Sequence, residues 1–255
     1  MKKTDWRVAT LFTQARHYSP VMPKLTKHWL GTYVNDKLVG VLTLGWGTNP
    51  MGTIKKMFPD LTTDDYYEIG KMCMDESMKK NSETQMMSAA VSWLRKKEPD
   101  LKYIFTWADG LVGKPGYVYQ AFNFLYGGFI WTDTYVTDKG EKVHPRTMQG
   151  VIPNTKNRKY GMRPNPEQLK EMNISRVKGR QFRYIFPMTK RDRKYLKNST
   201  VTWNLDYPKE KDLIWKIKKP GETSYNQTEK MPFDLSKETE INKQKYDGAS
   251  LDKFF

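Results

Sequence analysis

Residues 102–129 constrain the fold of this chain more than any other segment, because they join a strand pattern to a helix pattern through a polar loop. Residues 103–108 form a short apolar and aromatic run typical of a buried strand, and Asp109-Gly110 ends it as a turn would. Apolar residues recur at helical spacing over 118–125, and Gly127-Gly128 then supplies a left-handed stop. Ligands usually bind where such a helix begins beside the carboxyl end of such a strand. The side chains expected in that crevice are Asp109, Tyr119 and Gln120.

A second strand and helix precede this unit. Residues 66–74 have the composition of a strand, and residues 83–97 carry an apolar face with basic residues at its C-terminal end. Ser82 and Gln85 stand at the spacing of a capping box, which predicts where the helix begins. The order of strand, helix, strand and helix predicts a crossover with two parallel strands, whose helices begin at the same edge of the sheet.

Shorter patterns fill the rest of the chain. Residues 32–34 and 38–44 predict a hairpin, and residues 48–65 predict a loop with one helical turn. Further strands are expected at 129–137 and 181–188, with a turn leading away from about 140 to 146. The segment after Pro208 is rich in Lys and Glu with few apolar anchors, so we expect it to be partly disordered or loosely docked.

Charge and cysteine content narrow the class of protein. The chain has 44 Lys and Arg against 28 Asp and Glu, a net charge of +16, which favours an acidic partner and first of all nucleic acid. No apolar run approaches the roughly 18 residues of a membrane-spanning helix, and no secretory signal stands at the N-terminus. The single cysteine, Cys73, excludes an internal disulfide. These features predict a cytoplasmic protein.

The positive charge is concentrated in residues 141–197, which hold 16 Lys and Arg and four Asp and Glu, so that this region alone carries +12. Aromatic residues interleave with the basic ones, as phosphate contacts combined with base stacking require. We expect double-stranded DNA as the partner, although a generic basic surface would have the same composition. The candidate DNA-binding side chains are Arg146, Arg176, Lys178, Arg180 and Arg183.

Several short motifs, in one order, resemble those of the phage Mom family. They are RHYSP at 16–20, LVGVLTLG at 38–45, KNSET at 80–84, TWAD at 106–109, GYVYQAFNFLYGG at 116–128, HPRT at 144–147 and KGRQFRYIFPM at 178–188. The resemblance runs from about residue 15 to 208. It implies an α/β (α+β) fold similar to the Gcn5-related N-acetyltransferases (GNAT), with a mixed, splayed central sheet, helices on both faces and a basic C-terminal extension. It also implies transfer of a carbamoylmethyl group to adenine N6.

The same resemblance suggests where a small-molecule donor would lie. In an acyltransferase-like sheet an extended donor lies between two splayed strands, with its phosphates on a helix N-terminus. Residues 75–82, which precede the helix here, contain no glycine for close approach of backbone to phosphate, which argues against acetyl-CoA and leaves the donor open. The candidate donor-binding residues are Lys79, Lys80, Asn81, Ser82 and Glu83.

The implied reaction assigns roles to the crevice. Adenine N6 is a poor nucleophile, so an enzyme must orient it and accept a proton during attack. The candidate catalytic residues are His17, Asp109 and Tyr119, and Tyr18, Tyr119 and Gln120 are candidates for contacts with an extruded base. His17 and Asp109, with Glu83, would also suit a metal ion.

These observations predict a catalytic domain over 1–208, including the basic region at 141–197, and a tail over 209–255. The predicted function is modification of adenine N6 in phage DNA, which protects that DNA from host restriction. Two alternatives stay open. One is an acyl-CoA-dependent N-acetyltransferase that acts on another amine, and the other is a non-catalytic basic DNA-binding protein. The oligomeric state is open as well.

Overall fold

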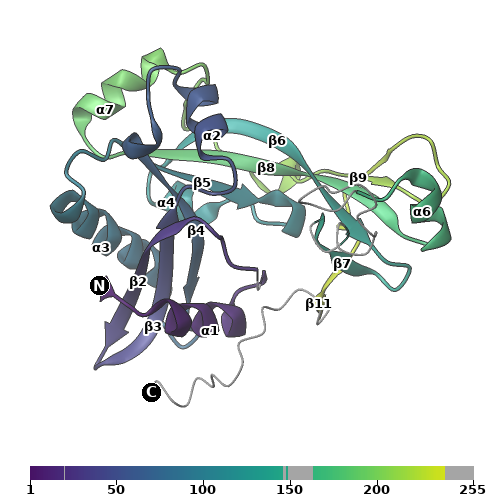
Figure 1. Cartoon of the computed structure of the whole chain (residues 1–255), viewed down its shortest axis with the longest axis horizontal. Coiled ribbons are helices and arrows are strands. Elements are labelled where there is room, and N and C mark those ends of the chain that lie inside the picture. Colours follow the sequence, from purple (N-terminus) through teal and green to yellow (C-terminus); the bar gives the residue numbers. More distant parts are fainter. Residues whose placement is uncertain (20, 146–147, 149–162, 239–255) are drawn as a thin grey trace, which may run out of the picture.

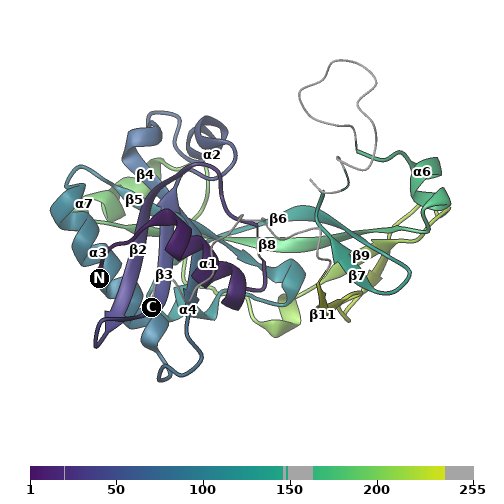
Figure 2. The ribbon, with the colours of Figure 1, turned by 60° about the horizontal axis from the view of Figure 1, so that its bottom comes forward.

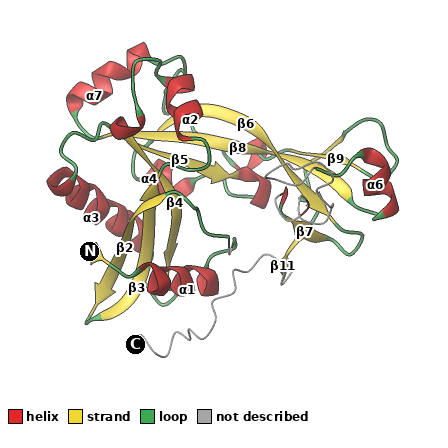
Figure 3. Ribbon diagram, in the orientation of Figure 1, coloured by secondary structure: helices red, strands yellow, loops and turns green. Residues whose placement is uncertain are grey.

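The fold is built around one large mixed sheet with helices on both faces (Figures 1 and 3). The structure is a computed structural model, and it describes residues 1–19, 21–145, 148 and 163–238. The strands are β1 (Lys2–Lys3), β2 (Thr26–Val34), β3 (Lys37–Gly45), β4 (Tyr66–Met74), β5 (Tyr103–Asp109), β6 (Leu125–Val136), β7 (Glu141–Val143), β8 (Ser175–Pro187), β9 (Trp215–Lys218), β10 (Asn226–Thr228) and β11 (Asp234–Glu238). The helices are α1 (Trp6–Arg16), α2 (Pro50–Met57), α3 (Ser82–Lys97), α4 (Tyr117–Ala121), α6 (Pro166–Glu171) and α7 (Lys190–Tyr195). None of these helices has both the length and the apolar character needed to cross a membrane.

The strand order is β1-β2-β3-β4-β5-β8-β6-β7-β11. The predicted hairpin is confirmed as β2 and β3, and both Asn35 (φ 49°) and Asp36 (φ 62°) adopt the left-handed conformation that a tight hairpin turn requires. The predicted parallel pair is confirmed as β4 and β5. The strand predicted at 181–188 returns to the sheet as the C-terminal half of β8 and lies antiparallel between β5 and β6.

Adjacent residues of β3 show how the two faces are covered. Val41 packs with Ala9 and Phe12 of α1, whereas Leu42 belongs to the cluster that contains Met86 and Met87 of α3. Since successive residues of a strand point to opposite faces, α1 and α3 cover opposite sides of the sheet. Each cluster supplies the apolar burial that holds its helix against the sheet.

The strands β4 and β5 separate along their length, which is the geometry that the resemblance implies. They pair through Tyr66 with Tyr103, Tyr67 with Ile104 and Glu68 with Phe105. Beyond these pairs, β4 continues to Met74 and β5 to Asp109 without further pairing to each other. Backbone groups that would normally close this part of the sheet are therefore parted, and a cavity opens there.

Two helix predictions need correction. The helix expected over 118–125 ends at Ala121, because Phe124 and Leu125 enter the core and Leu125 begins β6 opposite Ile185. The glycine pair lies within β6, where the register shifts between Tyr126 and Phe129. The single helical turn expected in the loop over 48–65 is the longer helix α2, whose apolar face packs in the core with Tyr66.

The capping box predicted at the start of α3 is also wrong. Asn81 is the N-cap in a left-handed conformation (φ 72°) and makes no side-chain capping bond, while the Ser82 hydroxyl donates to the Lys79 carbonyl at 2.6 Å. The Ser82 side chain therefore stabilises the backbone of the turn that precedes the helix, and it does not cap the helix.

Sequence analysis missed the strands after Pro208. β9 pairs with residues 176–179 of β8, on the edge of that strand where β5 has ended (Figure 2). Trp215 and Phe233 are buried at 4% and 6% exposure, and the Trp215 indole N–H donates to the Leu111 carbonyl at 2.8 Å. These two buried aromatic residues and the pairing of β9 with β8 dock this described part of the tail on the sheet.

Candidate functional site

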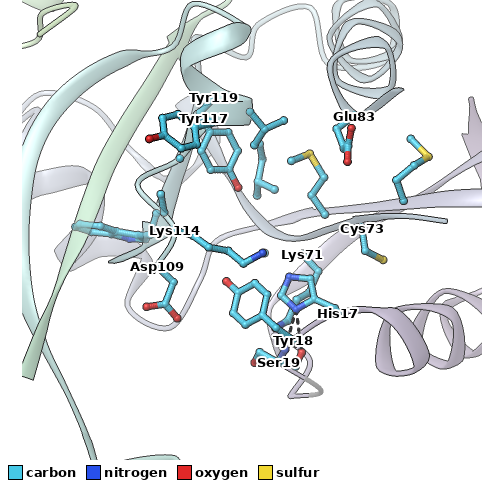
Figure 4. A pocket seen from close by; sticks show the side chains of 18 of the residues that line it. His17, Tyr18, Ser19, Lys71, Cys73, Glu83, Asp109, Lys114, Tyr117 and Tyr119 are labelled. Atoms are coloured by element: carbon cyan, nitrogen blue, oxygen red, sulfur yellow. Dashed lines mark hydrogen bonds between the residues drawn. The ribbon is translucent and has the colours of Figure 1, made fainter. Parts of the chain in front are cut away.

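A cavity of about 710 Å³ occupies the gap between β4 and β5 (Figure 4). Its walls come from the middle of β4, the end of β5, the segment after α1 and the loop that leads into α4. The ionisable and aromatic side chains that line it are Arg16, His17, Tyr18, Glu68, Lys71, Cys73, Glu76, Glu83, Trp107, Asp109, Lys114, Tyr117 and Tyr119. The predicted crevice residues His17, Tyr18, Asp109 and Tyr119 are therefore together.

His17 and Tyr18 follow the end of α1, where the helix stops with the His17 N–H donating to the Thr13 carbonyl. Their rings stack with centroids 4.2 Å apart. The Ser19 N–H donates to His17 Nδ1 at 3.0 Å, and the Lys71 ammonium donates to the Ser19 carbonyl at 2.9 Å. The turn after α1 is therefore tied to β4, which fixes the imidazole at the cavity wall.

His17 is neutral at physiological pH. Burial, reinforced by the positive charge of Lys71, lowers the pKa of His17 from 6.5 to about 3. Nδ1 lies 3.0 Å from the Ser19 nitrogen and 3.2 Å from the Ser19 carbonyl oxygen, so both ring contacts to Ser19 are made through Nδ1. Nε2 makes neither of these contacts, and it serves a ligand as donor in one neutral tautomer and as acceptor in the other.

Asp109 ends β5 and caps the short helical turn at Gly110–Val112, where its carboxylate accepts the Leu111 N–H at 3.2 Å. That bond fixes the side chain while leaving acceptor capacity on the carboxylate. Burial raises the pKa of Tyr18 well above 10, and the negative charge of Asp109 adds to the shift. Burial also raises the pKa of Tyr119. Both phenols therefore keep their protons.

Lys71 and Glu68 of β4 are cavity residues that sequence analysis missed. Burial lowers the pKa of Lys71 to about 8, although the nearby Asp109 carboxylate opposes the shift. Burial raises the pKa of Glu68 to about 7. The sequence did contain a signal for them, since both lie within the otherwise apolar strand YYEIGKMCM. Charged residues rarely lie inside a buried strand without a functional role.

A second hollow, of about 430 Å³, adjoins the first at the start of α3. Lys79, Lys80, Asn81 and Glu83 line it, as do Met74, Glu76, Tyr117 and Val118, and the last four together with Glu83 also line the main cavity. The helices α3 and α4 therefore begin beside one continuous depression. Lys79 and Lys80 give its outer end two ammonium groups that suit an anion, beside the carboxylates of Asp75, Glu76 and Glu83 in the same lining.

Two predicted residues do not line either hollow. The Gln120 amide N–H group donates to the Tyr184 hydroxyl and to the Pro208 carbonyl, each at 3.0 Å, and its carbonyl accepts from Lys209 at 3.1 Å. Ser82 is 5% exposed and bonded within its own turn. In the structure the Gln120 side chain links three segments of the chain, and the Ser82 side chain stabilises the turn before α3.

The candidate DNA-binding residues are spread over β8. Arg176 forms an ion pair with Asp133 at 2.8 Å, Lys178 lies over the Tyr225 ring at 4.6 Å, and Arg183 lies over the Trp107 ring at 5.4 Å. Arg180 donates to the Asp212 carbonyl at 2.9 Å. Arg146 and part of the basic region lie outside the described residues. Among the described residues, no three His, Cys, Asp or Glu side chains group as a metal site would require.

The splayed strands and the depression between them define a mixed-sheet α/β protein with a ligand-sized site between two parallel strands. Residues 1–209 match the Mom protein family, and the chain belongs to that family. It is 31% identical over 204 residues to the methylcarbamoylase Mom of Escherichia phage Mu, which covers 80% of each chain. A tandem GNAT protein from the clavulanic acid biosynthesis pathway aligns with a TM-score of 0.34 and 10% identity, over 71% of this chain and 60% of that one.

Proposed function

We propose that this protein is a phage DNA-modifying transferase that attaches a carbamoylmethyl group to adenine N6, and that the modification protects the DNA from host restriction. Membership of the Mom family and the name of the phage Mu relative support the reaction type. The observation that carries the proposal is the cavity between β4 and β5, which brings His17, Lys71 and Asp109 together.

The reaction needs a proton acceptor beside the attacking nitrogen. N6 forms a bond to the methylene carbon of the donor as the leaving group departs with its electron pair, and one N6 proton is lost. Asp109 is suited to accept that proton because its carboxylate is held in place by one N–H bond and keeps free lone pairs. The neutral His17 imidazole is suited to orient the adenine or the donor through Nε2, the ring nitrogen that does not contact Ser19.

The aromatic lining suits an extruded base. Modification of N6 within a duplex requires the nucleotide to leave the stack, and aromatic faces replace the stacking that is lost. Tyr18, Trp107 and Tyr117 line the cavity from three different segments. The donor would then lie along the depression that leads to Lys79 and Lys80, where an anionic group meets two ammonium groups.

The test is nucleoside mass spectrometry on DNA from cells that express the protein. We expect a new adenosine derivative with the parent and none with Asp109→Asn, because the amide keeps the bond to the Leu111 N–H but cannot accept the proton. Asp36→Asn is the matched control, since Asn also tolerates the left-handed turn at that position. A parent that binds DNA and leaves every adenosine unmodified would contradict the proposed function. An active Asp109→Asn variant would contradict only the role of the Asp109 carboxylate as proton acceptor.

A further inference from the structure

Several cationic side chains lie over aromatic rings in a row that starts at the lip of the cavity. We call this row the cation–ring track, and its members are Tyr117, Phe129, Trp131, Arg180, Lys209 and Lys216. Tyr117 lines the cavity and is 48% exposed, and the Lys209 ammonium lies 5.8 Å from its ring centroid. The track therefore begins where a ligand would enter.

Asp212 connects the lip to the outer part of the track. The Lys209 backbone N–H donates to the Asp212 carboxylate at 2.8 Å, and the Arg180 guanidinium donates to the Asp212 carbonyl at 2.9 Å. Arg180 in turn lies 4.4 Å from the Phe129 ring centroid and 5.8 Å from that of Trp131. The short helical turn Glu210–Asp212 thus links Lys209 at the lip of the cavity to Arg180 in the outer part of the row.

The outer end combines exposed rings with a further cation. Phe129 is 39% exposed and Trp131 38% exposed, and the Lys216 ammonium lies 4.5 Å from the Trp131 ring centroid. Trp131 and Arg180 are cross-strand partners, so their side chains share a face of the sheet. Exposed rings of this size, gathered in one place, mark an interaction surface.

The cations of the track keep their charge for a partner, since Arg180 and Lys209 donate to uncharged carbonyl oxygens of Asp212 and Gln120. The ion pairs found among the described residues do not involve Arg180, Lys209 or Lys216, whereas the neighbouring Arg176 is paired with Asp133. A surface that offers cations on aromatic faces, in a chain of net charge +16, is complementary to a polyanion that also presents flat rings. Nucleic acid has both properties.

We propose that the cation–ring track binds the DNA strand next to the target nucleotide, with its cations on phosphates and its rings against bases that extrusion has unstacked. This inference rests on the proposed function. Asp109 ends β5, β5 pairs with β8, and Arg180 of β8 pairs with Trp131 of β6, so the outer part of the track lies one to two strands from Asp109, with its side chains on the opposite face of the sheet. Two strand spacings are about 10 Å, the rise of about three stacked nucleotides. Lys216 lies beyond residues 1–209, so this chain extends the surface past the part that matches the family.

The experiment measures binding of a labelled single-stranded oligonucleotide and its duplex to the full chain over a range of salt. Trp131→Ala should weaken binding of the single strand by roughly fivefold or more, because a ring that stacks on a base is lost. Lys216→Met should lower the slope of log affinity against log salt by about one, since one phosphate contact is lost. Lys2→Met is the matched control, because the Lys2 ammonium also lies over a ring, 4.3 Å from the Tyr33 centroid.

The outcomes separate the two proposals. If the parent binds DNA and both track variants bind with its affinity and slope, the inference is wrong and the proposed function stands. A parent that neither binds nor modifies DNA overturns both. Should Trp131→Ala lower the melting temperature more than the control does, Lys216→Met decides, because Lys216 is only half-buried and belongs to none of the core clusters.

Discussion

At the scale of single residues, the cavity is a place where burial has moved pKa values in opposite directions. His17 and Lys71 hold their protons less tightly than in water, and Glu68 holds its proton more tightly. The common cause is the cost of a charge away from solvent, which outweighs the attraction between Lys71 and Asp109. Groups shifted in this way are enriched where proteins bind ligands or do chemistry.

The shift of His17 predicts a pH-dependent stability. The folded pKa, about 3, lies below the ordinary value of 6.5, so the unfolded chain takes up a proton first as the pH falls. The contribution is complete above pH 6.5 and is lost progressively toward pH 3. Between pH 6.5 and pH 5 the parent should lose about 1–2 kcal/mol relative to His17→Asn. Urea unfolding at both pH values measures the difference, and equal losses in the two proteins would contradict a neutral, buried His17.

Lys71 predicts a slope of the same sign at high pH. Its folded pKa, about 8, lies below the ordinary value of 10.5, so between these values the unfolded chain holds a proton that the folded chain has released. Stability should therefore rise with pH from about 8 to 10 in the parent and not in Lys71→Met, by about 1–3 kcal/mol. The variant should also lose modification activity, because the bond that fixes Ser19 is gone. Parallel curves of melting temperature against pH would show that Lys71 is not buried as a cation.

At the scale of elements, the turn before α3 determines how the Lys79 and Lys80 side chains are placed in the hollow at the start of that helix. The chain enters the helix through Asn81 in a left-handed conformation that no side-chain cap stabilises. This conformation suits Asn and Gly but not a β-branched residue. The spacing of Ser82 and Gln85 matched a capping box, so the sequence pattern did not predict the left-handed turn.

The turn gives a matched pair of substitutions. Asn81→Gly should leave the free energy of unfolding nearly unchanged, whereas Asn81→Val should lower it by about 1–2 kcal/mol because a branched Cβ is strained at positive φ. Chemical denaturation of the two variants beside the parent measures this. An Asn81→Val variant as stable as Asn81→Gly would mean that the residue is not left-handed in solution.

At the scale of the whole molecule, β8 is the element that joins the parts. Its C-terminal half pairs with β5 in the core, its N-terminal half pairs with β9 from beyond the family match, and β6 runs along its other edge (Figure 2). The tail is therefore tied to the sheet through the same strand that borders the cavity. Loss of β9 would leave part of β8 with an open edge.

Two truncations test this dependence. A chain that ends after Lys209 loses Trp215 and Phe233, both buried, together with the pairing of β9, and it should melt well below the parent and aggregate more readily. A chain that ends after Glu238 keeps these contacts and should melt close to the parent. Thermal unfolding followed by circular dichroism compares the three. Equal melting temperatures for the parent and for the chain that ends after Lys209 would show that the docked strands add nothing to stability.

The sequence by itself determined the strands and helices whose patterns are strong and local, and the crevice residues at their ends. The hairpin of β2 and β3, the strand β4, the helix α3 and the grouping of His17, Tyr18, Asp109 and Tyr119 all follow from periodicity, turn residues and motif order. Only the tertiary structure decided the rest. Lys71 and Glu68 became cavity residues because β4 and β5 part after three pairs, and Lys216 joined Trp131 because β9 reaches the free edge of β8. Such long-range pairing depends on burial summed over distant segments, which no local pattern carries.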